Sequence, residues 1–240
     1  MMKKYLLPGL TLAIGLTFAA APTIAPEFRG YAAGQLPVAI ERHAVQPAGY
    51  AFAIWGLIFA WLLASAAFGL LRRADHPVWA RTRPALMGAM VLGTVWLFLA
   101  STQPLLATAV ILVMAVCAIA AFLRADSGID RWLLSAPLAI FAGWVSAASM
   151  VSVGIMLGGY GLLPHPTAAL VMVAVLLAGA IYIQSRRPLM PVYGATVVWA
   201  IIAVAVVNRA DQPMVAVVAT AAALIMAAAT TRARLRASLL

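Results

Sequence analysis

Charged residues are scarce in this chain of 240 residues: Asp, Glu, Lys and Arg together make up 9% of it, and only six residues are acidic. Hydrophobic residues make up 65%, and the mean hydropathy is +1.04. A water-soluble domain of this composition would have to expose a large apolar surface. The composition therefore excludes a soluble protein and predicts that the chain lies in a lipid bilayer.

Cysteine and histidine are nearly absent as well. The one cysteine, Cys117, lies in the middle of an apolar run, and a single cysteine rules out an intrachain disulfide. The sequence holds no Cys and His cluster with metal-ligand spacing, no glycine-rich phosphate loop and no Ser, His and Asp set placed by a motif. We therefore expect neither enzymatic activity nor a resident metal or cofactor.

Eight apolar runs divide the chain. Several are separated by only a few residues that include a proline, which ends one helix and starts the next, so neighbouring helices are expected to be antiparallel. At 1.5 Å per residue, runs of this length match a hydrocarbon core of roughly 30 Å. The predicted fold is an all-α, polytopic integral membrane bundle of about eight transmembrane helices, over residues 5–25, 47–71, 84–102, 105–123, 132–157, 164–184, 190–207 and 213–231.

The net charge of +10 is explained by topology rather than by nucleic-acid binding. If the N-terminus is cytoplasmic, all of the 16 Lys and Arg residues except Arg29, Arg42 and Arg209 fall on the cytoplasmic side. Lys and Arg collect on that side of membrane proteins. The asymmetry predicts cytoplasmic N- and C-termini, in what we expect to be a bacterial inner membrane.

The first run also has features of a signal peptide, because Lys3 and Lys4 precede a short apolar stretch that ends in two Ala-x-Ala patterns. Each pattern is followed by a proline, Pro22 or Pro26, which disfavours cleavage. We expect residues 1–25 to be retained as a helix.

Apart from His165 at the start of the run 164–184, no Asp, Glu, Lys, Arg or His lies within a predicted run, whereas ion-coupled transporters usually carry an ionisable residue there. Ion-coupled transport is therefore disfavoured.

The loop from Pro26 to Gln46 is the longest polar stretch, with Glu27 and Arg29 at its start. It is either a lid over the mouth of the bundle or a mobile connector. His43 in this loop and His165 are placed on the same side of the membrane. They either approach one another, where they could hold a metal or haem iron, or are two ordinary loop histidines.

The second run begins with Pro47 in its expected first turn and carries more aromatic residues than an interfacial belt needs. Residues 52–59, FAIWGLIF, follow a first helix and a long loop. This arrangement resembles the TspO/MBR family of tryptophan-rich sensory proteins, also called translocator proteins. Trp96 resembles the second Trp of the family's Asn-Trp-x-Trp stretch, and Trp144 and Ala148 resemble its Trp-x-x-x-Ala segment.

The resemblance covers residues 1–157 and implies a five-helix core, to which residues 158–240 add three transmembrane helices. The chain also departs from the family's pattern. The Trp-Tyr-x-x-Leu-x-Lys-Pro loop motif is absent, Phe59 replaces a tyrosine, and Gly93 replaces the Asn before the third-run Trp. These departures concern ligand preference more than family membership.

Three tryptophans, Trp55, Trp96 and Trp144, lie inside three different runs, away from the interfaces where belt tryptophans belong. A flat aromatic ligand can stack on such rings, in contacts worth about 0.5–1.5 kcal/mol each beyond area burial. In the resembling family these positions border a cavity implicated in porphyrin binding. We therefore predict ligand binding at these three residues, with a supporting wall of Tyr50, Phe52 and Phe59.

The predicted function is a membrane-embedded binding or sensory protein for an apolar, tetrapyrrole-like ligand. One alternative is that the three tryptophans only fill space in the bundle. A second is a passive or exchange transporter of small hydrophobic or amphipathic molecules, and a third is a membrane enzyme acting on tetrapyrroles.

Small residues recur at four-residue spacing in the fifth run, as at Gly154 and Gly158, and this spacing lets helix backbones approach closely. They serve either an interface inside the chain or a homodimer contact, which the resemblance suggests.

Overall fold

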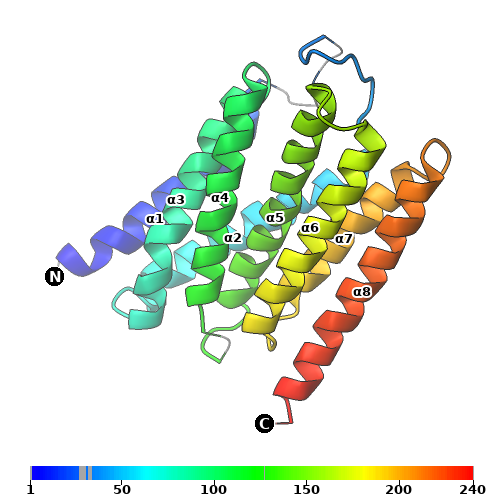
Figure 1. Cartoon of the computed structure of the whole chain (residues 1–240). Helices are drawn as coiled ribbons and strands as arrows, with labels where there is room; N and C mark the ends of the chain where they lie inside the picture. The colour runs from blue at the N-terminus through cyan, green and yellow to red at the C-terminus, as the bar shows by residue number, and fades with distance from the viewer. Residues whose placement is uncertain (1, 27–30, 32–33, 127, 240) are drawn as a thin grey trace. The chain divides into compact units, whose positions relative to one another are not determined.

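The computed structural model describes residues 2–26, 31, 34–126 and 128–239, and in these residues it contains helices and no strands. This confirms the predicted all-α class. Two short 3₁₀ helices, η1 (Ala21–Thr23) and η2 (Gly49–Ala53), lie before α2. The α-helices (Figure 1) are α1 (Met2–Ala20), α2 (Ile54–Arg72), α3 (Pro77–Ala100), α4 (Pro104–Arg124), α5 (Ser135–Gly159), α6 (His165–Arg186), α7 (Val192–Val207) and α8 (Pro213–Ala237).

Seven of these helices are long and apolar enough to span a membrane, among the residues that the structure describes. The remaining one, α7, has 16 residues, and at 1.5 Å per residue it is about 24 Å long, less than a hydrocarbon core of roughly 30 Å. It is short because residues 187–191 form a turn, closed by the Met190 N–H donating to the Arg187 carbonyl. The prediction of eight helices is confirmed, with α7 below the usual length of a span.

Proline marks the helix starts as the sequence predicts. A proline occupies the first turn of α3, α4, α6 and α8. Proline is tolerated there because the first-turn N–H groups have no intrahelical partner and its φ angle already suits a helix. These prolines fix the short connections between successive helices.

The start of α3 was predicted wrongly. The helix begins at Pro77 rather than at residue 84, and it therefore includes Arg81 and Arg83. Arg83 is 3% exposed, and it donates hydrogen bonds to the backbone carbonyls of Gly69, Arg73 and Ala74. A buried cation thus caps the C-terminal end of α2, where unpaired carbonyls carry partial negative charge. The expectation that no ionisable residue lies in a span is corrected accordingly.

The start of α2 was also predicted too early. Pro47 precedes the helix, a 3₁₀ turn covers Gly49–Ala53, and the α-helix begins at Ile54. The Ala48 N–H donates to the carbonyl of Ala203 in α7, so the chain before α2 is tied to another helix instead of continuing its own.

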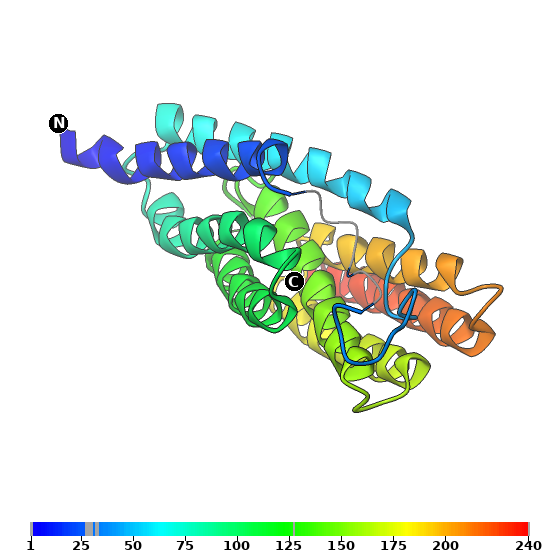
Figure 2. The same cartoon turned by 90° about the horizontal axis from the view of Figure 1, so that it is seen from above.

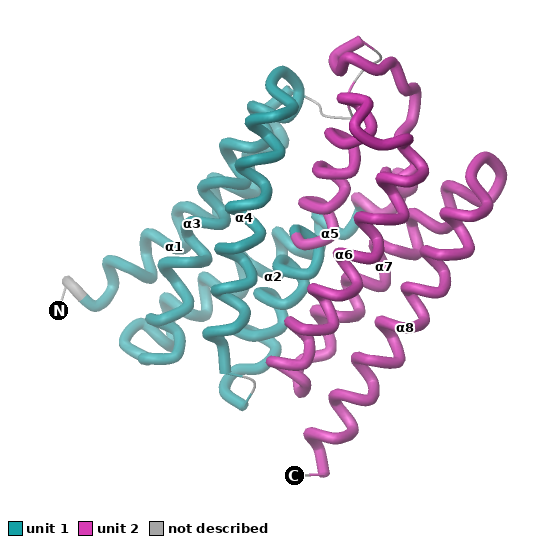
Figure 3. Tube along the Cα trace, viewed as in Figure 1, with its two compact units in different colours: residues 1–28, 53–145 teal, residues 29–52, 146–240 magenta. Residues whose placement is uncertain are grey.

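The chain divides into two compact units (Figure 3): unit 1 comprises Met1–Phe28 and Ala53–Val145, and unit 2 comprises Arg29–Phe52 and Ser146–Leu240. In unit 1, α3 packs on α4, and α1 packs on both α2 and α3. Figure 2 shows α1 and α2 side by side. In unit 2, α6, α7 and α8 pack against one another. The predicted division into residues 1–157 and 158–240 follows the family resemblance and stays a prediction.

Helix α5 contributes to both units, and its residues 135–147 are all buried. Its small residues pack inside the chain. A Cβ at Gly154 would lie 3.1 Å from Val45 Cγ1 and 3.2 Å from Met172 Cγ, and one at Gly158 would lie 3.0 Å from His43 Nδ1. These contacts support the internal interface that the sequence left as an alternative, while a homodimer stays a prediction.

Candidate functional site

Five aromatic rings from three helices of unit 1 form one group, which we call the aromatic cluster: Phe18 (α1), Trp55 and Phe59 (α2), and Phe141 and Trp144 (α5). Trp55 and Phe59 stack with ring centroids 5.2 Å apart and an interplanar angle of 21°. Phe18 meets Phe59 edge-on at 5.1 Å, and Trp55 meets Trp144 edge-on at 6.3 Å. All three distances lie within the range of favourable aromatic pairs.

The aromatic cluster has a buried part and an accessible part. Phe18, Phe141 and Trp144 are at most 3% exposed and belong to the core. Trp55 and Phe59 are only half-buried. The three buried rings therefore support a stacked pair that keeps accessible surface, and only that pair can offer ring surface to another molecule without a rearrangement of the core.

Three of the six predicted ligand-wall residues, Trp55, Phe59 and Trp144, are brought together in the aromatic cluster. Trp96 lies near the C-terminal end of α3, also in unit 1, and is half-buried. The other two, Tyr50 and Phe52, belong to the 3₁₀ turn before α2 and to unit 2.

Both side chains of that turn are exposed, and Tyr50 makes an edge-on contact with Trp199 of α7, with ring centroids 5.4 Å apart. The Trp199 indole N–H donates to the Ala51 carbonyl. Trp199 was not among the predicted site residues, and its contact ties the turn to α7.

Two rings of the cluster, Phe18 and Phe141, were missed by the sequence analysis. For Phe18 the sequence holds one indirect signal, at Gly93, where the resembling family has Asn. A Cβ at this position would lie 2.5 Å from Phe18 Cε2 and 2.8 Å from Met114 Cε. The ring of Phe18 thus rests on the backbone of α3, and Gly93 departs from the family's pattern where any side chain would displace that ring.

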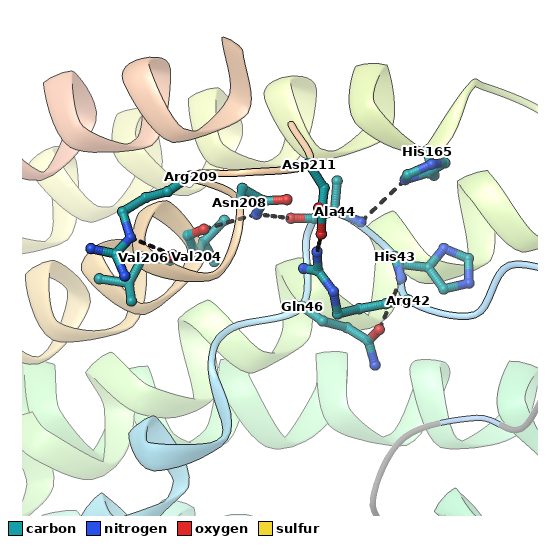
Figure 4. Close-up of polar contacts among 10 residues, drawn as sticks. All are labelled: Arg42, His43, Ala44, Gln46, His165, Val204, Val206, Asn208, Arg209 and Asp211. Carbon is teal, nitrogen blue, oxygen red and sulfur yellow. Dashed lines mark hydrogen bonds and ion pairs between the residues drawn. The ribbon is translucent and has the colours of Figure 1, made fainter. Parts of the chain in front are cut away.

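A polar pocket of about 380 Å³ lies in unit 2. It is lined by loop residues 39–42 and 44, by His165 at the start of α6, and by the α7–α8 connection. Across it, Arg42 Nη2 donates to Asp211 Oδ2 at 2.7 Å (Figure 4). We call this the polar pocket.

Hydrogen bonds to the loop backbone hold the described part of the long loop onto unit 2. The Val38 N–H donates to the Gly159 carbonyl at 2.8 Å, and the Asn208 side-chain amide donates to the Ala44 carbonyl at 2.7 Å. These bonds hold the described part of the loop in place and argue against the mobile connector, one of the two alternatives that the sequence left open. Glu27 and Arg29, at the start of the loop, lie outside the described residues.

Of the two alternatives that the sequence left open for His43 and His165, the structure shows the two rings close to one another. Their rings meet edge-on with centroids 6.4 Å apart. The Nδ1 atom of His165 accepts the Ala44 N–H at 3.3 Å, so this nitrogen is already engaged with the loop. In the part of the chain that the structure describes, no group of three or more His, Cys, Asp and Glu residues could hold a metal ion.

Burial and, to a smaller extent, the neighbouring His165 lower the pKa of His43 to about 4. In the unfolded chain the histidine pKa is about 6.5, so between about pH 6.5 and about pH 4 the unfolded chain binds a proton that the folded chain does not. The free energy of unfolding therefore decreases as the pH is lowered through this range. Acidification from about pH 7 to about pH 5 should cost up to about 2 kcal/mol of unfolding free energy. Thermal unfolding measured across this range tests the prediction.

A His43→Gln variant should reduce that pH dependence, because it removes one of the two rings of the pair; His165, which remains, contributes the rest. His76→Gln, which removes a histidine of unit 1, serves as the matched control for the loss of a ring outside this pair. Equal pH profiles for wild type and His43→Gln would contradict the assignment.

A comparison with protein families matched the chain to the family model described as TSPO-like protein, over residues 10–232. The match reaches all eight α-helices and extends past residue 157, where the resemblance in the sequence ended. Searches of curated proteins and of solved structures found no match. With its long apolar helices and a family match over most of its length, this chain is an integral membrane protein that belongs to the TSPO-like protein family.

Proposed function

We propose that this protein binds an apolar aromatic ligand of the porphyrin-like tetrapyrrole class at the aromatic cluster, and that it acts as a binding or sensory protein. The observation that carries the proposal is the stacked pair of Trp55 and Phe59, half-buried and supported by three core rings from α1 and α5. A flat macrocycle presents a large ring surface that can add to this stack.

The geometry gives the stacked pair a fixed orientation before any ligand binds. Phe18 touches both Trp55 and Phe59, while Phe141 and Trp144 each touch Trp55, all through edge-on or tilted contacts. Rings that are already held in place lose little conformational freedom on binding, which favours affinity. Trp96 remains part of the proposed ligand wall, whereas Tyr50 and Phe52 are not required for it.

For the membrane, we propose a bacterial inner membrane with cytoplasmic N- and C-termini. The support is the distribution of Lys and Arg, in which Arg42 and Arg209 lie at connections opposite to those that carry most of the basic residues.

Protoporphyrin IX should quench the tryptophan fluorescence of the purified full chain in detergent, and the quenching should saturate. Trp55→Leu should weaken binding roughly three- to tenfold, because it removes a stacking ring worth about 0.5–1.5 kcal/mol. Trp96→Leu and Trp144→Leu should weaken it as well. Trp132→Leu is the matched control, since Trp132 is 58% exposed and lies outside the aromatic cluster.

Quenching that rises linearly without saturating, or an affinity for protoporphyrin IX equal to that of the wild type in all four variants, would show that the tryptophan rings only pack the core. If binding is confirmed, flux of the porphyrin into proteoliposomes distinguishes the binding protein from the alternative of a passive or exchange transporter. Saturable binding without flux supports the proposal as stated.

A further inference from the structure

The polar pocket is lined mainly by charged and polar side chains, whereas the aromatic cluster consists of apolar rings, and the pocket belongs to the other unit. We infer that it binds a small zwitterionic molecule of the amino-acid class, whose ammonium group contacts Asn208 and Asp211 and whose carboxylate contacts Arg42. This inference is independent of the proposed tetrapyrrole site.

Asn208 lines the pocket although it is 0% exposed. Its side-chain nitrogen donates to two carbonyls, those of Ala44 at 2.7 Å and Val204 at 2.8 Å (Figure 4). These two bonds fix the orientation of the amide, so Oδ1 must face away from both carbonyls as an acceptor. Among the described residues, Oδ1 has no hydrogen-bond partner.

A buried acceptor without a partner costs about 1–3 kcal/mol. A donor group in the pocket would remove this cost. Asp211, which also lines the pocket, supplies a carboxylate that favours a positively charged donor over a neutral one.

Arg42 offers a hydrogen-bond donor, the counterpart of the acceptor on Asn208. Its Nη2 atom is engaged by Asp211, whereas its Nη1 atom is shielded from solvent and has no hydrogen-bond partner among the described residues. The N-terminal ends of α6 and α8 adjoin the pocket through His165 and Gln212, and helix N-termini favour negative charge. The pocket therefore also suits an anionic acceptor group.

The acceptor Oδ1 of Asn208 and the donor Nη1 of Arg42 together favour a ligand with a hydrogen-bond donor at one end and an anionic group at the other. A simple anion would leave Asn208 Oδ1 unsatisfied and would face the carboxylates of Glu41 and Asp211. A simple cation would leave Arg42 Nη1 unsatisfied. The volume of about 380 Å³ lies at the small end of the range for ligand pockets, roughly 300–1,000 Å³. A free amino acid meets all three conditions.

Isothermal titration calorimetry of the full chain in detergent tests the inference with glycine, L-serine and L-glutamine as probes. At least one should bind saturably with a dissociation constant near or below about 1 mM. Acetate and ethylamine, which carry only one of the two groups, should bind at least about tenfold more weakly, because each leaves one buried group unsatisfied.

Two variants test the site without touching the amide that holds the loop. Arg42→Gln removes the guanidinium that contacts the ligand's carboxylate in this proposal. Ala39→Phe places a bulky ring in the pocket from an exposed residue of its lining. Each should weaken binding at least about tenfold. Arg209→Gln is the matched control: Arg209 is exposed on the same α7–α8 connection, its Nε donates to the nearby Val206 carbonyl, and it is not among the described residues that line the pocket. It should bind within about twofold of wild type.

Thermal unfolding without ligand shows whether each variant is folded. Absence of saturable heat for all three amino acids up to about 20 mM would overturn the inference and leave the pocket to water. Acetate binding as tightly as the amino acids would overturn it in favour of a simple anion site. Unchanged affinity in Ala39→Phe, which keeps the Arg42 ion pair, would overturn it as well.

Discussion

Replacing Arg83 with methionine should lower the free energy of unfolding by roughly 3–5 kcal/mol, because it removes the three hydrogen bonds that the buried guanidinium donates to backbone carbonyls at the end of α2. Arg83 is 3% exposed, and its two terminal nitrogens reach the carbonyls of Gly69, Arg73 and Ala74 at 2.9–3.1 Å. Methionine fills a similar space but donates nothing. Denaturant titration of the protein in detergent micelles measures the difference.

Arg81→Met is the matched control, because Arg81 lies two residues away on α3, is exposed, and bonds to the single carbonyl of Arg124. Arg81→Met should lower the free energy of unfolding by less than about 1 kcal/mol. Arg83→Lys should fall between the two, since an ammonium donates hydrogen bonds but lacks the planar fork of a guanidinium. Equal losses at Arg81 and Arg83 would contradict a capping role for Arg83.

Gly93→Ala should destabilise the protein by about 2–3 kcal/mol, the upper part of the range of about 1–3 kcal/mol for overpacking a filled core. The added methyl would overlap Phe18 and Met114. Met114 has a flexible side chain that can move, but Phe18 is held by Trp55, Phe59 and Phe141. We therefore expect the aromatic cluster to shift, which a change in tryptophan emission and weaker protoporphyrin IX binding would report.

Gly88→Ala supplies the control on the same helix. A Cβ there would lie 3.6 Å from Cys117 Sγ, an ordinary contact, so the change should be neutral or stabilise by up to about 1 kcal/mol through better helix propensity. In the double variant of Gly93→Ala with Phe18→Ala, the losses should be less than additive, because the overlap with the ring is gone. Strict additivity would mean that Gly93 does not seat Phe18.

Much of the fold could be predicted because bilayer insertion leaves a simple signal. Apolar runs of sufficient length mark the helices, and prolines such as Pro104 and Pro213 mark their starts. The errors occurred where distant groups decide a boundary. Arg83 was assigned to a connection on account of its charge, but the carbonyls of α2 make it part of α3.

The candidate site could be predicted only in part, for a similar reason. Motif spacing identified Trp55 and Trp144, but nothing in one run shows which ring of another run it will meet, so Phe18 was missed. The polar pocket depends on pairs far apart in the chain, since Arg42 and Asp211 are separated by 169 residues. The sequence places both on the same side of the membrane and cannot show that they touch.

The long loop is made early in synthesis, yet its partners are made late. Ala44 forms hydrogen bonds with His165, 121 residues later in the chain, and with Asn208, 164 residues later. Since chains emerge and fold from the N-terminus, Val38 can join α5 first through the Gly159 carbonyl, but Ala44 has neither of these partners until α6 and α7 have been inserted. A chain that ended after α5 would leave this segment without those hydrogen bonds. Closure of the loop therefore marks a late step in assembly, and protease protection of residues 34–48 would report when the C-terminal helices have docked.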